Sequence, residues 1–284
     1  MKLARFEFNN EISCGVVTDN GIIDFKKIDF PHHDLQSLIE AGPEALTMLK
    51  EHCEGVAAHY PLTDVTLLAP IPRPGKFLAI GMNYKKHVEE ASKLGVDERK
   101  HQTWFNKQIT CVNDPFGKIE KGVTEKLDYE VELGVVIGKR SKKLTADNVR
   151  DAIFGYLIVN DVSARDWQFH TLTFTMGKSF DTHGPIGPWI VTADEIENPE
   201  NLDLRCYVNG ELRQSNNTSQ MIHGINDQLI YLSTAFTLEP GDIIATGTPE
   251  GVGVAMEPPV FLQPGDVVKC EIDQIGAIEN AVVA

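Results

Sequence analysis

The sequence predicts a β-rich α+β fold, a sandwich or roll that follows a small N-terminal α+β module. After Lys126 short apolar runs with the alternation of strands dominate, helical patterns are few, and no strand–helix rhythm of a parallel sheet is sustained. The chain has 284 residues, 42% of them hydrophobic and 24% charged, which is ordinary globular composition. A chain of this length buries about 75% of its unfolded surface, so it needs no disulfide or metal to hold its core.

The small module is predicted over residues 1–70. Its strand patterns are KLARFEF, SCGVVTD and GIIDFKK, and the turn sequences NNE and DNG separate them. Two helical patterns follow at 35–40 and 44–52. The segment LLAPIPRPGKF then holds three prolines, which make a chain stiff and extended. We therefore place a boundary near Pro70–Pro74 and assign residues 71–284 to a larger catalytic domain.

A short helix is predicted after this boundary. Asn83 is a suitable N-cap and Gly95 a suitable stop. His87 and Glu90 are three residues apart between them, so they share one helix face. A surface histidine beside an acid is common, and the spacing alone does not establish catalysis.

Short strand patterns fill the rest of the chain. The sequence YVNGELR predicts a hairpin whose Asn209-Gly210 pair suits a type I′ turn. Helices are expected only at 145–152 and 225–235.

Charge and cysteine content limit the function classes. The formal net charge is −15, with 26 basic and 41 acidic residues, so nucleic-acid binding is not expected. Five scattered cysteines without CxxC spacing indicate free thiols in a reducing compartment. The N-terminus lacks the pattern of a secretory signal, and no apolar run approaches the ~18 residues of a membrane span. We expect a cytoplasmic protein with no membrane or nucleic-acid partner.

Acidic residues occur at alternate positions of the segment LDYEVELGVVIG. Asp128, Glu130 and Glu132 would share one face of a strand. An acidic solvent face on an antiparallel strand is one interpretation. However, the strand continues as LGVVIG, which is apolar on both faces. Two desolvated carboxylates at ~4 Å repel by about 4 kcal/mol at an effective dielectric constant of 20, so a proton or a cation is expected between them.

Another acid, Asp161, ends the apolar run GYLIVND and also needs a partner. Carboxylates without a neighbouring cysteine or paired histidine suit a hard divalent ion. Mg²⁺ fits best, with Mn²⁺ and Ca²⁺ as alternatives. Three such ligands leave about half of an octahedral shell for water or a chelating substrate.

Five ordered segments resemble the fumarylacetoacetate hydrolase family: DYEVELGVVIGKR, GYLIVNDVSARDWQ, GKSFDTHGPIGPW, VNGELRQ and PGDIIATGTPEGVG. The resemblance extends from Pro72 to the C-terminus, and residues 1–70 are similar to the accessory module of bacterial members. It implies a mixed β-sandwich roll, a homodimer, and Mg²⁺ or Mn²⁺ held by a Glu-x-Glu pair and an aspartate. The implied ligands are Glu130, Glu132 and Asp161, and Asp128 receives no ligand role.

The resemblance also implies roles for other residues. Lys178 is similar to a buried lysine beside the metal, and His87 with Glu90 to a His–Glu pair on a lid-like helix. Gln168 and Thr248 match positions that contact the substrate. Without the family, each of these would be an ordinary polar residue.

Three further positions near these motifs have simpler interpretations. We expect Arg165 and Asp166 to form a structural ion pair. His183 is a weak candidate for lining the pocket.

The reaction implied is hydrolysis of a C–C bond in a 2,4-diketo acid of the acylpyruvate type. The keto-acid end would chelate the metal, the His–Glu pair would activate water, and the metal and Lys178 would stabilise the enolate that leaves. No G-x-S-x-G motif occurs, which disfavours a serine hydrolase. An oxaloacetate-type decarboxylase, a keto-acid isomerase, and a non-catalytic binding protein remain alternatives.

One segment departs from the family pattern. Hydrolase-like members often carry a tryptophan shortly before GKSF, whereas this chain reads TLTFTMGKSF. Phe174 and Met176 are therefore expected to alter the pocket for the acyl tail.

Overall fold

The computed structural model describes residues 1–93, 95 and 100–284. Its largest sheet has the strand order β3-β2-β1-β13-β11-β10-β16-β5-β6, with β4 beside β1 and β7 beside β13. These strands are β1 (Lys2–Phe8), β2 (Glu11–Thr18), β3 (Gly21–Asp24), β4 (Thr66–Leu68), β5 (Phe77–Gly81), β6 (Thr103–Lys107), β7 (Val112–Asn113), β10 (Val131–Ile137), β11 (Ile153–Asn160), β13 (Gly184–Thr192) and β16 (Ile243–Ala245).

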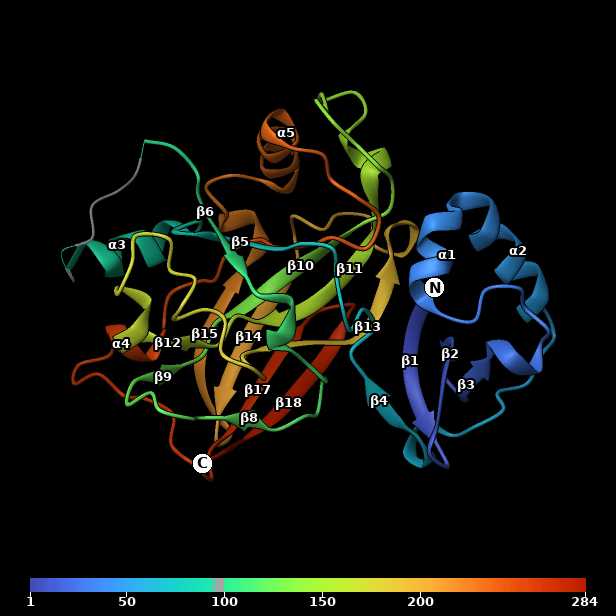
Figure 1. Cartoon of the computed structure of the whole chain (residues 1–284), viewed down its shortest axis with the longest axis horizontal. Coiled ribbons are helices and arrows are strands. Elements are labelled where there is room, and N and C mark those ends of the chain that lie inside the picture. Colours follow the sequence, from blue (N-terminus) through green and yellow to red (C-terminus); the bar gives the residue numbers. More distant parts are fainter. Residues whose placement is uncertain (94, 96–99) are drawn as a thin grey trace.

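A second sheet packs against the first, and Figure 1 shows it beside β10 and β11. Its order is β15-β14-β17-β18-β8. The strands are β8 (Ile119–Glu120), β14 (Asp203–Val208), β15 (Glu211–Asn217), β17 (Val267–Ile272) and β18 (Gly276–Val283), and a separate pair joins β9 (Leu127–Asp128) to β12 (Ser163–Ala164).

The core lies between these sheets. Leu133 and Ile158 of the first share one buried apolar cluster with Leu204 and Val268 of the second. β10 and β11 are buried along their whole length, whereas β14 and β17 alternate between buried and half-buried residues. The predicted β-rich α+β fold with a sandwich of mixed sheets is confirmed.

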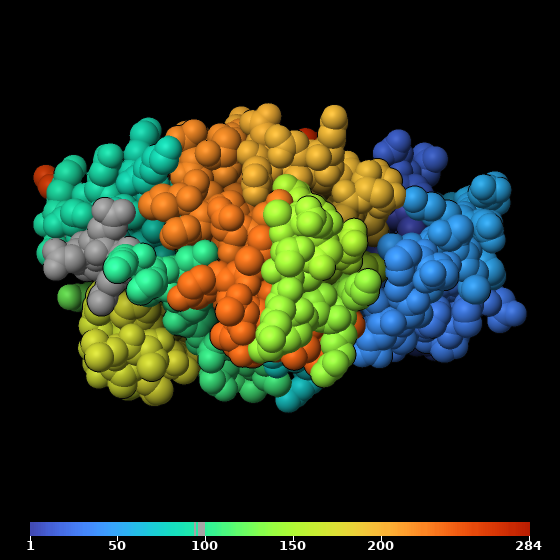
Figure 2. Space-filling model, turned by 90° about the horizontal axis from the view of Figure 1, so that it is seen from above, coloured from blue at the N-terminus to red at the C-terminus, as the bar shows by residue number. Residues whose placement is uncertain are grey.

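The N-terminal segment is joined to the rest through the main sheet. β1 pairs with β13 in antiparallel register, with Lys2 opposite Val191. Leu3 lies in a buried cluster together with Leu157 and Ile190. Figure 2 shows this segment, in blue, at one end of the molecule. The main sheet and one apolar cluster contain residues from both sides of Pro70–Pro74. The domain boundary near these prolines stays a prediction.

The helices are short and lie outside the sheets (Figure 1). The α-helices are α1 (Leu35–Ala41), α2 (Pro43–Cys53), α3 (Lys85–Lys93), α4 (Arg165–Gln168) and α5 (Ile225–Ala235). The 3₁₀ turns are η1 (Phe25–Lys27), η2 (Leu62–Asp64), η3 (Ile109–Cys111), η4 (Val149–Ala152), η5 (Ala193–Glu195), η6 (Thr218–Gln220) and η7 (Gly253–Ala255). Among the described residues, no helix is long and apolar enough to cross a bilayer.

Several local predictions are confirmed. α1, α2 and α5 occur where the patterns placed them, and the Asp34 side chain caps α1 by accepting a bond from the Ser37 N–H. Asn209 and Gly210 have φ angles of 53° and 79° between β14 and β15, as a type I′ hairpin requires.

Two helix predictions need correction. The helix expected over 145–152 is only η4, because the Asn148 side chain accepts the Thr145 N–H and closes a turn there. Asn83 is not the N-cap of α3. Its amide instead bonds the backbone of His223 and Thr246, which ties the start of the α3 segment to two distant loops. Leu94, inside the helix expected to end at Gly95, lies outside the described residues.

Leu157→Ala is expected to lower the free energy of unfolding by about 2–5 kcal/mol, because it leaves a cavity where the N-terminal segment meets the rest. Leu157 is fully buried, whereas Leu212 is 51% exposed and serves as the matched control. Leu212→Ala should change stability by less than about 0.5 kcal/mol. Urea denaturation measures both, and equal effects would contradict a shared core at this position.

Candidate active site

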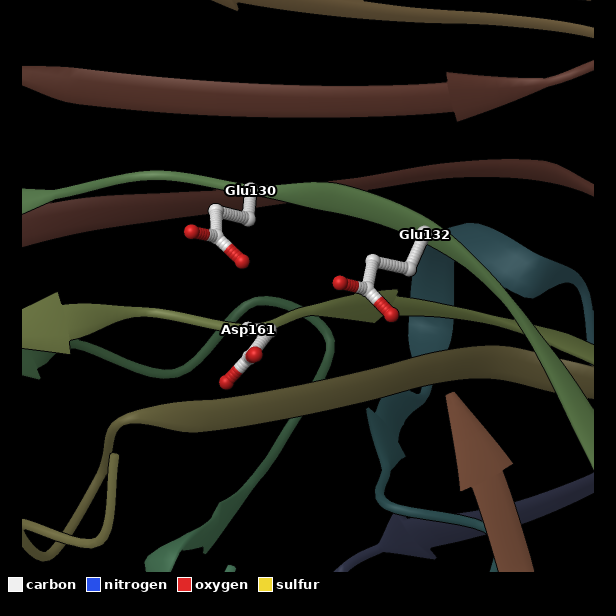
Figure 3. Close-up of side chains that lie close together, drawn as sticks. All are labelled: Glu130, Glu132 and Asp161. Atoms are coloured by element: carbon white, nitrogen blue, oxygen red, sulfur yellow. The ribbon is translucent and has the colours of Figure 1, made fainter. Parts of the chain in front are cut away.

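Three buried carboxylates converge at the adjoining ends of β10 and β11. Glu130 precedes β10, Glu132 lies within it, and Asp161 follows β11, whose Asn160 is opposite Val131. Figure 3 shows that the three side chains lie close together. Each offers an oxygen atom, and these atoms lie within 4.8 Å of one another. The structure thus brings together the three acids that the sequence analysis selected as metal ligands.

The strand that carries these acids is interrupted. The segment expected as one strand is divided into β9 and β10 at Tyr129-Glu130, because Glu130 bonds elsewhere: its N–H donates to the Asn160 side chain and its carbonyl accepts the Asp161 N–H. Asp128 therefore lies outside the group. It accepts hydrogen bonds from the N–H groups of Gly253 and Val254.

Buried cations neutralise most of this charge. Lys178 Nζ is 2.8 Å from both Glu130 Oε2 and Asp161 Oδ2. Lys107 Nζ is 2.6 Å from Asp161 Oδ1. Arg165 is 2.7 Å from Glu130 and 2.8 Å from Asp128. The strand sequence alone contains no cation that could neutralise these acids. The structure supplies three from distant segments, so a metal would not be the sole counter-charge.

Two details of this network differ from the sequence analysis. The expected Arg165–Asp166 ion pair is wrong: Asp166 instead accepts bonds from the Thr124 hydroxyl and the Glu125 N–H. Lys107 was missed. It ends the strand pattern TWFNK, and a lysine that closes an aromatic strand is the one signal that the sequence offered.

Among the described residues, one carboxylate at this site contacts no cation. With Asp128, which shares Arg165 with Glu130, the ion-pair network and the acidic cluster together hold four carboxylates, and the contacting cations are three: Lys107, Lys178 and Arg165. The carboxylate without such a contact is Glu132, which accepts the Gly247 N–H at 2.8 Å.

The pKa values of the two glutamates diverge for this reason. Burial, with Asp161 and Glu130 nearby, raises the pKa of Glu132 well above its usual range. Burial also opposes ionisation of Glu130, but Lys178 and Arg165 outweigh it and hold the pKa of Glu130 at about 2. A cluster of hard oxygen donors with one orphaned carboxylate fits a divalent ion such as Mg²⁺ or Mn²⁺.

A cavity of about 240 Å³ opens beside the cluster. Its polar lining includes Glu130, Glu132 and Lys178, and α3 contributes His87 and Glu90. His87 Nδ1 is 3.4 Å from Glu90 Oε2, which is long for a hydrogen bond. Glu90 also accepts the Gly251 N–H at 3.0 Å, and this contact anchors α3 over the cavity.

The predicted substrate-binding residues also reach the cavity. Gln168 lines it, and its Oε1 accepts a bond from Arg165 Nη1 at 3.1 Å. Thr248 lines it as well, but its hydroxyl donates to the Val131 carbonyl and accepts from Gln214, each at 2.9 Å. The contact of Thr248 with a substrate carboxylate stays a prediction.

His183 was the weak candidate, and it is not among the described residues that line the cavity. Its Nε2 is 2.8 Å from the Glu120 carbonyl, and its ring stacks on Phe180. Burial lowers the pKa of His183 to about 4, so it is a neutral core histidine.

Known proteins share this fold. A model of the fumarylacetoacetate (FAA) hydrolase C-terminal family matches residues 76–283. Over 292 residues the chain is 40% identical to the mitochondrial oxaloacetate tautomerase fahd2 of Xenopus laevis, covering 100% of this chain and 90% of that protein. It is 40% identical over 302 residues to the oxaloacetate tautomerase YisK of Bacillus subtilis, covering 99% of this chain and 100% of that protein.

A solved structure extends the comparison. Maleylpyruvate hydrolase from Sphingobium sp. SYK-6, in complex with manganese and pyruvate, superposes with a TM-score of 0.82 at 32% identity, covering 100% of this chain and 99% of that one. Tautomerases and a hydrolase are therefore both similar to this chain, and the similarity alone does not select a reaction.

At a pH below the raised pKa of Glu132, metal binding is expected to release a proton, because the ion would displace the proton of that carboxyl. The pKa of Glu132 is higher in the folded protein than in the unfolded chain, where it is about 4.3. Protonated Glu132 therefore stabilises the metal-free fold fully below about pH 4.3, and this stability is lost as the pH rises through the pKa of the folded protein. Affinity for Mg²⁺ should rise over the same range. Calorimetry in two buffers of different ionisation enthalpy measures the proton, and an enthalpy independent of the buffer would contradict the assignment.

Glu132→Ala should abolish Mg²⁺ binding, since it removes the carboxylate of the acidic cluster that contacts no cation among the described residues. The control is Glu125→Gln, whose side chain is 83% exposed and outside the cluster. Titration calorimetry measures both variants. Unchanged affinity in Glu132→Ala would rule out this metal site.

Proposed function

Because the chain belongs to the fumarylacetoacetate hydrolase family, we propose that it is a divalent-metal-dependent enzyme of keto–enol chemistry that tautomerises oxaloacetate. One observation supports this most directly: Glu130 and Glu132 of the acidic cluster, Lys178 and the His87–Glu90 pair line a single cavity of about 240 Å³. The tautomerase names of full-length relatives at 40% identity point to the same reaction. The small volume suits a substrate of few atoms.

The acidic cluster would hold the ion through Glu130, Glu132 and Asp161. When bound, a divalent ion would act as a Lewis acid toward the 2-keto oxygen and the neighbouring carboxylate. Lys178 is 98% buried, so its ammonium lies in a low-dielectric site where it stabilises developing negative charge strongly. Burial would lower the pKa of Lys178, but Asp161 and Glu130 raise it above its usual value, so it stays charged.

Proton transfer is assigned to α3. Conversion of the enol to the ketone removes the proton of the enol oxygen and adds one at C3. His87 would transfer the proton that is added at C3, and Glu90 would orient the imidazole through Nδ1. The 3.4 Å separation of the pair can shorten when a substrate fills the cavity, since catalytic hydrogen bonds are often long in a free enzyme.

Hydrolysis of an acylpyruvate, which the sequence analysis predicted as the main reaction, is the second candidate here. The solved maleylpyruvate hydrolase is similar along the whole chain, and apolar residues make up half of the cavity lining. In this reaction His87 would take a proton from water, the hydroxide would add to C4, and the C3–C4 bond would break. The products would be pyruvate and a carboxylic acid.

The products separate the candidates in one assay. With Mg²⁺ present, the purified protein should speed the loss of the ultraviolet absorbance of enol-oxaloacetate without forming pyruvate. Free carboxylic acid and pyruvate from an acylpyruvate would favour hydrolysis, and CO₂ from oxaloacetate would favour a decarboxylase. Absence of all three activities would leave a binding protein and contradict the proposal.

His87→Ala is expected to slow the reaction by ~10²–10⁴-fold, the effect of losing a general acid–base group. Mg²⁺ affinity should stay unchanged, because His87 is not among the clustered carboxylates. His33→Ala, on the exposed surface, is the control. Equal steady-state rates for His87→Ala and wild type would reject the assigned role.

A further inference from the structure

The cavity has an aromatic wall that the proposed reaction does not use. The wall consists of Phe105 from β6 and of Phe169 and Phe174 from the loop after α4. Ring centroids of Phe105 and Phe174 are 6.1 Å apart, those of Phe169 and Phe174 are 5.8 Å apart, and both pairs meet edge to face. This loop bulges in yellow from the end of the molecule opposite the blue N-terminal segment (Figure 2).

The wall begins next to the proposed catalytic lysine. Lys178 Nζ lies 5.0 Å from the centroid of Phe105, close enough for a cation–π contact. From there the rings lead through Phe174 to Phe169, which is 63% exposed. A substrate whose reacting end lies at Lys178 would therefore extend along this wall toward the solvent.

Phe174 is held in its place by a strained backbone. Its φ is 60°, in the left-handed region that a bulky residue rarely adopts. Its carbonyl accepts the Lys178 N–H at 3.2 Å, and its N–H donates to the Thr171 carbonyl at 3.4 Å. The loop thus orients the Phe174 ring into the cavity, whereas Leu172, two residues earlier, is 95% exposed.

The charged groups of the cavity already have partners. Among the described lining residues, the cationic groups Lys178 and Arg165 are paired with the acidic cluster, and His87 is beside Glu90. A carboxylate placed against the aromatic wall would lose water without gaining a partner. An alkyl or aryl group there would be buried favourably.

We propose that Phe174 is a specificity-determining residue, and that the wall selects 2-keto acids with an apolar substituent at the C4 end. Acylpyruvates with a short alkyl or aryl tail carry such a group beyond C4, whereas oxaloacetate, whose C4 is a carboxylate, has no tail to place against the wall. This inference rests on the proposed function, because it takes the reacting end to lie at Lys178. The wall binds the tail and takes no part in the proton transfer.

The test compares keto acids that differ only in the tail. For wild type, kcat/KM for enol conversion should rise about fourfold per methylene from acetylpyruvate to butanoylpyruvate, the factor for one buried methylene. Phe174→Gly removes the ring and accepts the positive φ, so the increase should disappear while Phe174→Leu retains part of it. Leu172→Ala, in the same loop, is the matched control and should keep the full increase.

The ratio between tailed and short substrates isolates the wall, since any shift of Lys178 affects all substrates alike. A wild-type increase that Phe174→Gly leaves intact would overturn the inference, as would a wild type indifferent to the tail. Calorimetric affinities for pyruvate and 2-oxohexanoate with Mg²⁺ provide a second readout. Tail-dependent binding without turnover of any keto acid would overturn the proposed function and support the wall.

Discussion

The site depends on an imbalance of buried charge. In the part of the chain that the structure describes, four carboxylates meet three cations between β10, β11 and the surrounding loops, and Glu132 is the carboxylate that contacts none of them. Each unpaired charge in a low-dielectric interior is unfavourable, so the cluster must take up a proton or a cation. The ion pairs orient the acids, and the missing charge makes the cluster a receptor for a divalent ion. Without this imbalance the cluster would be a closed structural network.

The fold provides the distances that this arrangement needs. Antiparallel pairing of β10 and β11 places Glu132 beside Asp161, although 29 positions separate them along the chain. β6 and the loop after α4 then bring Lys107 and Lys178 to the same point. Glu90 fixes α3 to Gly251, which keeps His87 at the cavity. Groups from five segments therefore meet at or directly beside one cavity, and the aromatic wall begins next to Lys178.

Patterns local in the sequence predicted local structure well. The strands of the β-rich fold, α5 and the Asn209-Gly210 turn followed from alternation and turn chemistry. The buried acids followed from their apolar context, and the family resemblance was needed to leave out Asp128. Long-range partners could not be found this way. Lys107 pairs with Asp161 across 54 positions, and Arg165 bonds Asp128 and Glu130 in place of the adjacent Asp166. The homodimer and the cytoplasmic location stay predictions.

Keto–enol chemistry and C–C hydrolysis share the same first requirement, which is a stabilised enolate beside a proton donor. Both candidate reactions therefore depend on the metal site. The most direct measurement is an anomalous difference map from a crystal that contains Mn²⁺. The account predicts one strong peak per chain, about 2.0–2.6 Å from oxygens of Glu130, Glu132 and Asp161. A map with no peak among these carboxylates, or with Mn²⁺ only at surface acids, would contradict it.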